Sequence, residues 1–260
     1  MLTNCQCFDS FARIIFIGGV KMTPKQPKNP FPAIAPMGVD GLLLRFADKL
    51  SESANHAALG FRSALAKDPL AGVEEVAAAL ASVYLRFDPT QTSYETLHAA
   101  LENRLRQPWQ AALESRRRWL IPTVYGGEHG PQLAEVAALA GMSEQAAMAQ
   151  ISATPLRVMS LGFAPGQPYL GLLPKAFDLP RQSALTKEVP AGALTLAIRQ
   201  CVLFATPAPT GWRHIGQTRF EAFLPESDTP FPLRPGDELL FAPVSVDDLS
   251  RHAPRMEPIP

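Results

Sequence analysis

The chain has 260 residues, of which 47% are hydrophobic, and it carries 24 basic and 24 acidic side chains. A formal net charge of zero gives no overall field that would attract nucleic acid or an acidic membrane surface, so neither is expected as a partner. The length suits one large domain or two modest ones, each able to bury a core.

The three cysteines, Cys5, Cys7 and Cys201, are too few for a disulfide framework, and no Cys/His cluster has zinc-ligand spacing. We therefore expect incidental thiols in a reducing, cytoplasmic compartment and no metal site. No stretch approaches the roughly 20 apolar residues that a membrane helix requires.

The composition of the first 36 residues indicates a disordered tail or a mis-assigned start. The apolar run 11–20 is interrupted by Arg13, and residues 21–36 are rich in Pro and Lys. No basic region precedes the apolar run, which argues against a signal peptide. Met22 and Met37 are candidate true starts.

Residues 37–108 predict a small α+β domain. Alternating side chains indicate strands over 41–47 and 82–88, whereas 73–80 is ambiguous between strand and helix. Ser51 can cap one helix, and Thr92-Ser93-Tyr94-Glu95 has the form of a capping box that opens a second. The order of strands and helices favours a ferredoxin-like arrangement with the helices on one face of a sheet.

A polar connector over 107–118 separates this domain from a second one over 117–257. The run Arg116-Arg117-Arg118 could be a phosphate-binding patch, although a solvated linker face is the commoner meaning of such a run.

The second domain begins with a strand-like stretch over 119–125 and two helices. Pro131 suits the first position of one helix, and Ser143 can cap the next. The pair imitates a helix-turn-helix, but residues 144–152 contain no Arg or Lys, so DNA binding is rejected.

From Leu156 onward, short apolar runs separated by Gly and Pro predict a β-barrel or sandwich. These runs are 157–163, 193–205, 212–223 and 238–244, the last of them following a tight Pro-Gly-Asp turn at Pro235.

Three constellations could form a site, and each also has a purely structural explanation. Residues 125–131 (Tyr-Gly-Gly-Glu-His-Gly-Pro) offer glycines and a helix start to an anion. Residues 162–171 combine glycines, prolines and two aromatic residues in a rigid loop that lacks the spacing of a phosphate-binding loop. Residues 210–218 place Trp212 and His214 after a Gly turn; a histidine in a strand is more often packed than catalytic.

Together and in this order, the constellations resemble the family of B-type 5-oxoprolinase subunits, also described as KipI-like or as allophanate hydrolase subunit 1, a carboxyltransferase-domain family. The similar elements are Tyr-Gly-Gly-Glu-x-Gly-Pro at 125–131, Gly-Phe-x-Pro-Gly-x-x-Tyr-Leu at 162–170, Val-Pro-Ala-Gly at 189–192 and Gly-Trp-x-x-x-Gly-x-Thr at 211–218. The resemblance covers about 38–246. It implies a ferredoxin-like N-terminal domain and a cyclophilin-like β-barrel C-terminal domain.

The resemblance also implies a function. Such subunits act with a KipA-like C subunit and an A subunit, using ATP as co-substrate to open 5-oxoproline to glutamate. Relatives act in urea or allophanate metabolism, or inhibit a sensor histidine kinase without being enzymes, and both remain alternatives. The chain departs from the family pattern at Gln132, Gln167, Cys201, Thr210 and the pair Leu185-Thr186. The last stands where a Pro-Arg pair is common, so a cation suited to a carboxylate or phosphate is missing there.

We therefore predict a subunit of an ATP-dependent amide hydrolase whose groove is formed by the three constellations, which converge in space. No acid or base is assigned. The predicted groove-lining residues are Tyr125, Gly126, Gly127, Glu128, Gly162, Phe163, Pro165, Gly166, Tyr169, Gln200, Gly211, Trp212, His214, Gly216 and Thr218.

Overall fold

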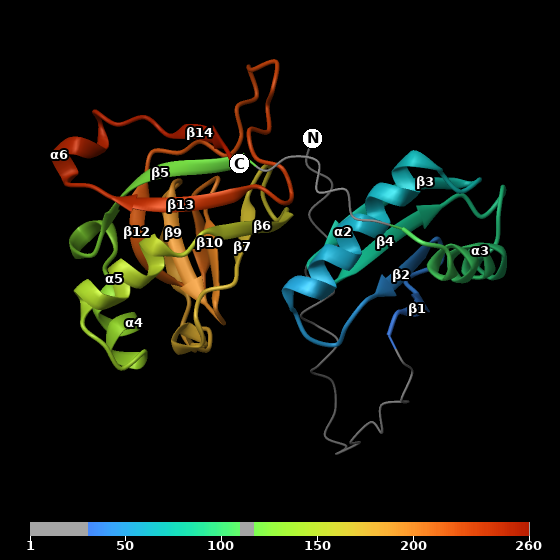
Figure 1. Ribbon diagram of the computed structural model, residues 1–260, viewed down its shortest axis with the longest axis horizontal. Coiled ribbons are helices and arrows are strands. Elements are labelled where there is room, and N and C mark those ends of the chain that lie inside the picture. The colour runs from blue at the N-terminus through green and yellow to red at the C-terminus, as the bar shows by residue number, and fades with distance from the viewer. Residues whose placement is uncertain (1–30, 110–116, 260) are drawn as a thin grey trace. The chain divides into compact units, whose positions relative to one another are not determined.

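The N-terminal layer is a four-stranded antiparallel sheet with two helices (Figure 1). The computed structural model describes residues 31–109 and 117–259. The sheet has the order β1-β2-β4-β3. Both helices bury residues in the same cluster as the sheet. The elements are β1 (Ala33–Pro36), β2 (Gly41–Arg45), α2 (Glu52–Lys67), β3 (Val73–Ala79), β4 (Ser82–Phe87) and α3 (Tyr94–Arg106).

Both helices of this layer begin at serine caps. Ser51 Oγ accepts a hydrogen bond from the backbone N–H of Ala54 at 3.2 Å, which confirms the predicted cap. The second cap is Ser93, which accepts from the N–H of Thr96 at 3.2 Å. The predicted capping box was therefore wrong by one residue, since Thr92 precedes the cap and Glu95 lies within the first turn.

The prediction of a tail over 1–36 was wrong for its last part. Residues 1–30 lie outside the described residues, but β1 pairs with β2, Ala33 lying opposite Arg45 and Pro36 opposite Leu42. An edge strand tolerates proline because one side of its backbone needs no partner in the sheet. The ferredoxin-like description of this layer stays a prediction.

The second region is a closed β-barrel, as predicted, with seven strands in the ring and β14 attached to β5 as an eighth. The ring has the order β12-β9-β10-β7-β6-β13-β5 and closes because β12 also pairs with β5. Its strands are β5 (Arg117–Tyr125), β6 (Leu156–Leu161), β7 (Pro168–Gly171), β9 (Ala193–Ala197), β10 (Gln200–Leu203), β12 (Arg213–Thr218) and β13 (Glu238–Pro243), with β14 (Arg255–Pro258). The cyclophilin-like description stays a prediction.

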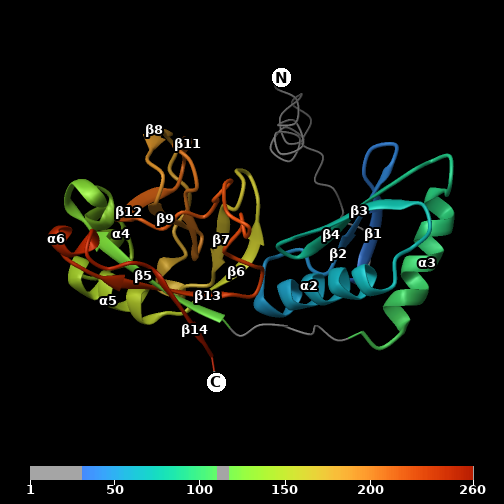
Figure 2. The same ribbon diagram turned by 90° about the horizontal axis from the view of Figure 1, so that it is seen from above.

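Shorter elements cover the barrel. The strands β8 (Thr186–Val189) and β11 (Ala208–Thr210) form a separate two-stranded sheet and lie side by side (Figure 2). The remaining elements are η1 (Gly127–His129), α4 (Leu133–Leu139), α5 (Glu144–Ala153), η2 (Lys175–Phe177) and α6 (Val246–Leu249). Within 31–109 and 117–259, no helix has both the length and the apolar character needed to cross a membrane.

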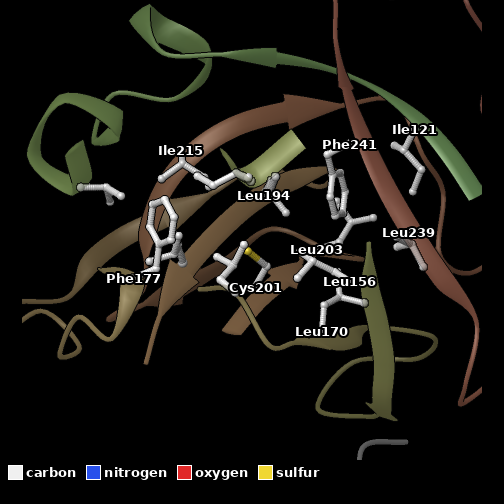
Figure 3. Close-up of a cluster of buried hydrophobic side chains, with 14 of the residues drawn as sticks. Ile121, Leu156, Leu170, Phe177, Leu194, Cys201, Leu203, Ile215, Leu239 and Phe241 are labelled. Atoms are coloured by element: carbon white, nitrogen blue, oxygen red, sulfur yellow. The ribbon is translucent and has the colours of Figure 1, made fainter. Parts of the chain in front are cut away.

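The interior of the barrel is filled by aliphatic and aromatic side chains, among which Cys201 lies (Figure 3). The helices α4 and α5 pack against each other and bury Val136 and Ile151 in this core. The segment that imitates a helix-turn-helix thus packs its apolar faces on the barrel. Pro131 does not start α4 as predicted, because Gln132 is the N-cap and Leu133 the first helical residue.

The apolar run 193–205 forms two strands, β9 and β10, rather than one. Ile198 and Arg199 have φ of 46° and 63°, and positive values at both positions are typical of a tight type I′ hairpin turn. Neither residue favours this backbone, but the turn is held from outside: the N–H of Ile198 donates to the carbonyl of Leu179 at 2.7 Å, and that of Arg199 to Phe177 at 3.0 Å. The run 212–223 is also shorter than predicted, since β12 ends at Thr218.

Arg117 and Arg118, at the start of the barrel, form neither a linker face nor a free cationic patch. Arg117 and Arg118 belong to β5, and Arg116 lies outside the described residues. Arg117 Nε donates to Oδ1 of the fully buried Asp237 at 2.9 Å, and Arg118 pairs with Glu238. Asp237 Oδ2 also accepts from the N–H of Arg234 at 2.9 Å, so this carboxylate fixes the turn before β13.

Replacing Asp237 with Asn should lower the free energy of unfolding by about 3 kcal/mol, because it leaves the Arg117 guanidinium without its buried counter-charge. Urea unfolding at neutral pH measures the loss. Glu257→Gln is the control, since the Arg255–Glu257 pair is 71% and 46% exposed and should cost less than about 0.5 kcal/mol. Equal effects of the two substitutions would contradict the assigned role of Asp237.

Candidate functional site

The first constellation is bound to an irregularity in β12. The register of β12 against β9 shifts between His214 and Gly216, leaving Ile215 as an extra residue. The N–H of Gly126 donates to the Ile215 carbonyl at 3.2 Å. Gln132 satisfies both backbone groups of His214: its N–H donates to the His214 carbonyl at 2.9 Å, and its Oε1 accepts from the His214 N–H at 2.8 Å.

Two positions of this loop require glycine, Gly130 because it approaches β12 closely and Gly126 because of its positive φ. A Cβ at Gly130 would lie 2.1 Å from the Ile215 carbonyl oxygen, and Gly126 has a φ of +70°. Gly127 also has a positive φ, of +54°, but faces open space. The side chain of Glu128 is 87% exposed, and its Oε1 lies 3.8 Å from His129 Nε2. The loop therefore has a structural part that packs on β12 and a free tip.

Gly130→Ala should destabilise the protein by about 2 kcal/mol or more, because the new methyl group would meet a backbone oxygen that cannot move without opening the barrel seam. Gly211→Ala is the matched control: its Cβ would find neighbours no closer than 3.6 Å, an ordinary contact distance. Thermal and urea unfolding compare the two, and a tolerated Gly130→Ala would contradict the tight docking of the loop.

The second constellation is a shaped loop that packs on a neighbouring segment, as its composition predicts. The N–H of Gly162 donates to the carbonyl of Gln167 at 3.0 Å. A Cβ at Gly166 would lie 2.0 Å from the carbonyl oxygen of Ala222. Phe163 has a φ of +74° and is 53% exposed, and Pro165 is exposed too. This loop thus presents Phe163 and Pro165 at the surface and is held by its glycines.

The barrel strands carry a row of residues on their outer face. His214 lies opposite Thr195, Thr195 opposite Val202, and Val202 opposite Tyr169. Directly opposed residues of antiparallel strands share a face, and the intervening neighbours of Thr195 belong to the inner core. Trp212 reaches over this face, and its ring meets that of Tyr169 edge-on with centroids 6.3 Å apart. The second and third constellations therefore meet outside the barrel wall.

Gln182, which was not predicted, joins Gln132, the residue directly after the first constellation, to the third constellation. Gln132 Nε2 donates to Gln182 Oε1 at 2.5 Å, and Gln182 Nε2 donates to the carbonyl of Trp212 at 3.1 Å. The N–H of Gln182 also donates to the Gly211 carbonyl at 2.8 Å. Contacts thus connect all three constellations around Trp212, in agreement with the predicted convergence. That they line a binding groove stays a prediction.

Several predicted lining residues have framework contacts. Tyr125 packs against the barrel core and donates its hydroxyl to the Phe241 carbonyl at 3.1 Å, and burial raises the pKa of this phenol well above its usual range. Gly216 pairs with Tyr125. Thr218 Oγ1 donates to the Gly192 carbonyl at 3.2 Å. Tyr125 and Thr218 through their side chains, and Gly216 through its backbone, therefore stabilise the barrel.

Gln200 lies on the outer face, two residues before Val202 along β10. It is 2% exposed, and its Nε2 has no hydrogen-bond partner within the described part of the chain. Its place is compatible with the predicted lining, but among the described residues no hydrogen bond of its Nε2 joins it to the group around Trp212.

His214 is 6% exposed, and its Nε2 lies 3.0 Å from the carbonyl oxygen of Gly216, to which the neutral ring donates in the matching tautomer. Burial lowers the pKa of His214 and outweighs the hydrogen bonds to Gly216 and Gln217, which raise it; the charge of His129 adds a smaller lowering. A neutral, buried imidazole bonded to backbone is well suited to fix the bulge of β12. The packed alternative named for this histidine therefore has direct structural support.

The depressed pKa of His214 predicts a loss of stability in acid. The unfolded chain, with a histidine pKa of about 6.5, binds the proton before the folded chain does, so stability falls as the pH drops below about 6.5. Urea unfolding at several pH values should show a shallower fall in His214→Gln than in the unaltered chain. Part of the fall remains because burial also lowers the pKa of His56. His252→Gln, an exposed control, should keep the full pH dependence; an unchanged profile in His214→Gln would contradict the assignment.

Across 31–109 and 117–259, no group of three or more His, Cys, Asp or Glu side chains is placed to hold a metal ion. A hollow of about 180 Å³ lies in the N-terminal layer, lined by residues of α2, β3 and β4, and is smaller than most ligand pockets, which measure roughly 300 Å³ or more. It contains none of the predicted residues.

The fold is that of an α+β protein with a closed barrel, and the second and third Gly-rich elements meet on the outer face of its wall. Residues 32–233 match the family described as carboxyltransferase domain, subdomain C and D. The chain is 30% identical over 228 residues to the B-type 5-oxoprolinase subunit of Bacillus subtilis (strain 168), covering 83% of this chain and 94% of that protein. It is 41% identical over 152 residues to the Escherichia coli O157:H7 protein of the same name, covering 57% and 70%. The chain belongs to the family of B-type 5-oxoprolinase subunits.

A solved structure, that of TTHA0988, is 34% identical with a TM-score of 0.68 over 79% of this chain. The chain spans 40% of the length of TTHA0988, so the same fold occurs there within a longer polypeptide.

Proposed function

We propose that the chain is the B-type subunit of an ATP-dependent 5-oxoprolinase, acting with an A subunit and a KipA-like C subunit to convert 5-oxoproline, ATP and water to glutamate. The observation that carries the proposal is the joining of the three family elements around Trp212 through Gln132, Gln182 and Tyr169. The B. subtilis relative that shares 94% of its length with this chain has the name of that subunit.

The chemistry explains the need for several subunits. A lactam carbonyl is a poor electrophile, and phosphorylation of its oxygen by ATP, with release of ADP, would activate the carbonyl carbon toward water. Addition of water and cleavage of the ring C–N bond would give an acyl phosphate, from which a second water releases phosphate to leave glutamate. Such a reaction requires phosphate binding, lactam binding and exclusion of bulk water in one enclosed site. The group around Trp212 supplies an aromatic surface for one side of a site, and no residue of this chain is assigned the phosphoryl or proton transfer.

Three of the departures from the family pattern, at Cys201, Gln167 and Thr210, are absorbed into the framework. Cys201 is fully buried in the barrel core (Figure 3), where burial raises the pKa of its thiol. Gln167 is 1% exposed, and its Oε1 accepts from the N–H of Ala205 at 3.3 Å. Thr210 Oγ1 accepts from the N–H of Trp212 at 3.0 Å. These substitutions therefore do not by themselves favour the kinase-inhibiting alternative, in which an altered lining marks loss of catalysis.

The direct test is to co-express the chain with A- and C-type subunits of the same organism, purify the complex and measure glutamate formed from 5-oxoproline and ATP. We expect a stable complex with ATP-dependent turnover. Trp212→Ala should lower kcat/KM by about tenfold or more, because it removes a large aromatic contact surface from the site.

Arg251→Gln, which alters an exposed side chain beside α6, is the control and should leave kcat/KM within about twofold. Absence of both a complex and turnover would contradict the proposal. Binding of a sensor histidine kinase in a pulldown, with no turnover by the complex, would favour the regulator instead.

A further inference from the structure

Arg181 extends the group around Trp212 with a positive charge that the sequence comparison did not anticipate. Its guanidinium carbon lies 5.4 Å from the centroid of the Trp212 ring, over the ring face. It is also close enough to Tyr169 for its charge to favour the phenolate, against the burial that raises the pKa of that tyrosine. Arg181 therefore belongs to the same outer face of the barrel as the predicted aromatic residues.

The backbone on both sides of Arg181 is held by the site. Arg213 Nη1 donates to the carbonyl of Pro180 at 2.6 Å, and Arg213 is itself anchored by its ion pair with Glu135, Nε to Oε1 at 2.8 Å. On the other side, the N–H of Gln182 donates to the Gly211 carbonyl at 2.8 Å. The residues before and after Arg181 are thus fixed to β12 and its preceding turn, which limits where the guanidinium can lie.

The charge of Arg181 has no partner within the described part of the chain. No carboxylate lies within ion-pair distance of it among residues 31–109 and 117–259, whereas the neighbouring Arg213 is paired. Arg181 is exposed. An arginine stacked on an indole keeps the N–H groups along its edge free, and that edge matches the two oxygens of a carboxylate or phosphate. Stacking also reduces the conformational freedom that the side chain would lose on binding.

We propose that Arg181 is the anion-binding residue of this site and holds a carboxylate or phosphate group of a small ligand at the edge of the Trp212 ring. The identity of the anion rests on the proposed function: 5-oxoproline carries a carboxylate, and ATP and its products carry phosphates. The presence of an anion site at Arg181 does not depend on that function.

The test measures binding of 5-oxoproline and, separately, of inorganic phosphate by calorimetry, using the full chain alone and in complex with A- and C-type subunits. The indole N–H resonance of Trp212, assigned by comparison with Trp212→Phe, reports whether the ligand is beside Arg181. Arg181→Gln should weaken binding by about tenfold or more, as expected for loss of a charged hydrogen-bond pair. The dissociation constant of Arg181→Lys should lie between those of the unaltered chain and Arg181→Gln, because lysine keeps the charge but lacks the planar guanidinium with its paired N–H donors.

Arg62→Gln is the matched control: it makes the same change of charge at an exposed position of α2 and should alter the dissociation constant less than about twofold. Since Arg181 is exposed, its variants should fold, and melting temperatures verify this. Binding of 5-oxoproline alone identifies a carboxylate site, and binding of phosphate alone a phosphate site; either supports the proposal when it depends on Arg181. No saturable binding in either form of the protein, or equal binding by Arg181→Gln, overturns it.

Turnover separates this inference from the proposed function. If Arg181-dependent binding occurs but the complex produces no glutamate, the anion site stands and the proposed function fails. If the complex is active and Arg181→Gln leaves both KM values and kcat unchanged, the proposed function stands and the assignment of Arg181 fails.

Discussion

The bulge in β12 is the constraint on which the barrel and the candidate site both depend. The same few residues must pair with β9 on one side and β5 on the other, and must also bind the loop that follows β5. A regular strand has no backbone groups left for a third partner, whereas a bulge re-aims some of them. Here the carbonyls of His214 and Ile215 accept from Gln132 and Gly126. The same residues of β12 therefore close the barrel and position the first Gly-rich element.

The two faces of the barrel wall have different roles, because residues on the inner face form the core and residues on the outer face lie outside it. In β10, Cys201 points into the core and Val202 outward; in β7, Leu170 lies in the core and Tyr169 outside. Because side chains alternate along a strand, each motif contributes to both stability and surface. A motif found in the sequence therefore contains both core residues and surface residues. A residue does not belong to a binding surface merely because it is part of the motif. Tyr125 shows this most clearly, since its hydroxyl is bonded to backbone.

The sequence predicted those features that depend only on neighbouring residues, such as helix caps and the alternation of side chains along a strand. The caps at Ser51 and Ser143 and the alternation in β4 needed no knowledge of distant residues. Features that depend on tertiary contacts could not be predicted in this way. The turn at Ile198 and Arg199 is favoured by neither residue and is stabilised by carbonyls of a segment about twenty residues earlier. The same limit explains why 117–118 resembled a linker: the carboxylates that pair with those arginines lie 120 positions away.

Arg181 illustrates the corresponding limit for the site. A motif comparison asks whether a given residue type stands at a given position, and at 185–186 the expected cation is absent. Electrostatic recognition requires instead that a charge lie at a given point in space, which a residue four positions earlier can satisfy if its backbone is turned toward the same ring. Arg181 places its charge over the Trp212 ring, where the proposed anion site lies. Loss of a motif residue is therefore weak grounds for inferring loss of ligand binding, unless the space that its side chain would occupy is shown to lack an equivalent group.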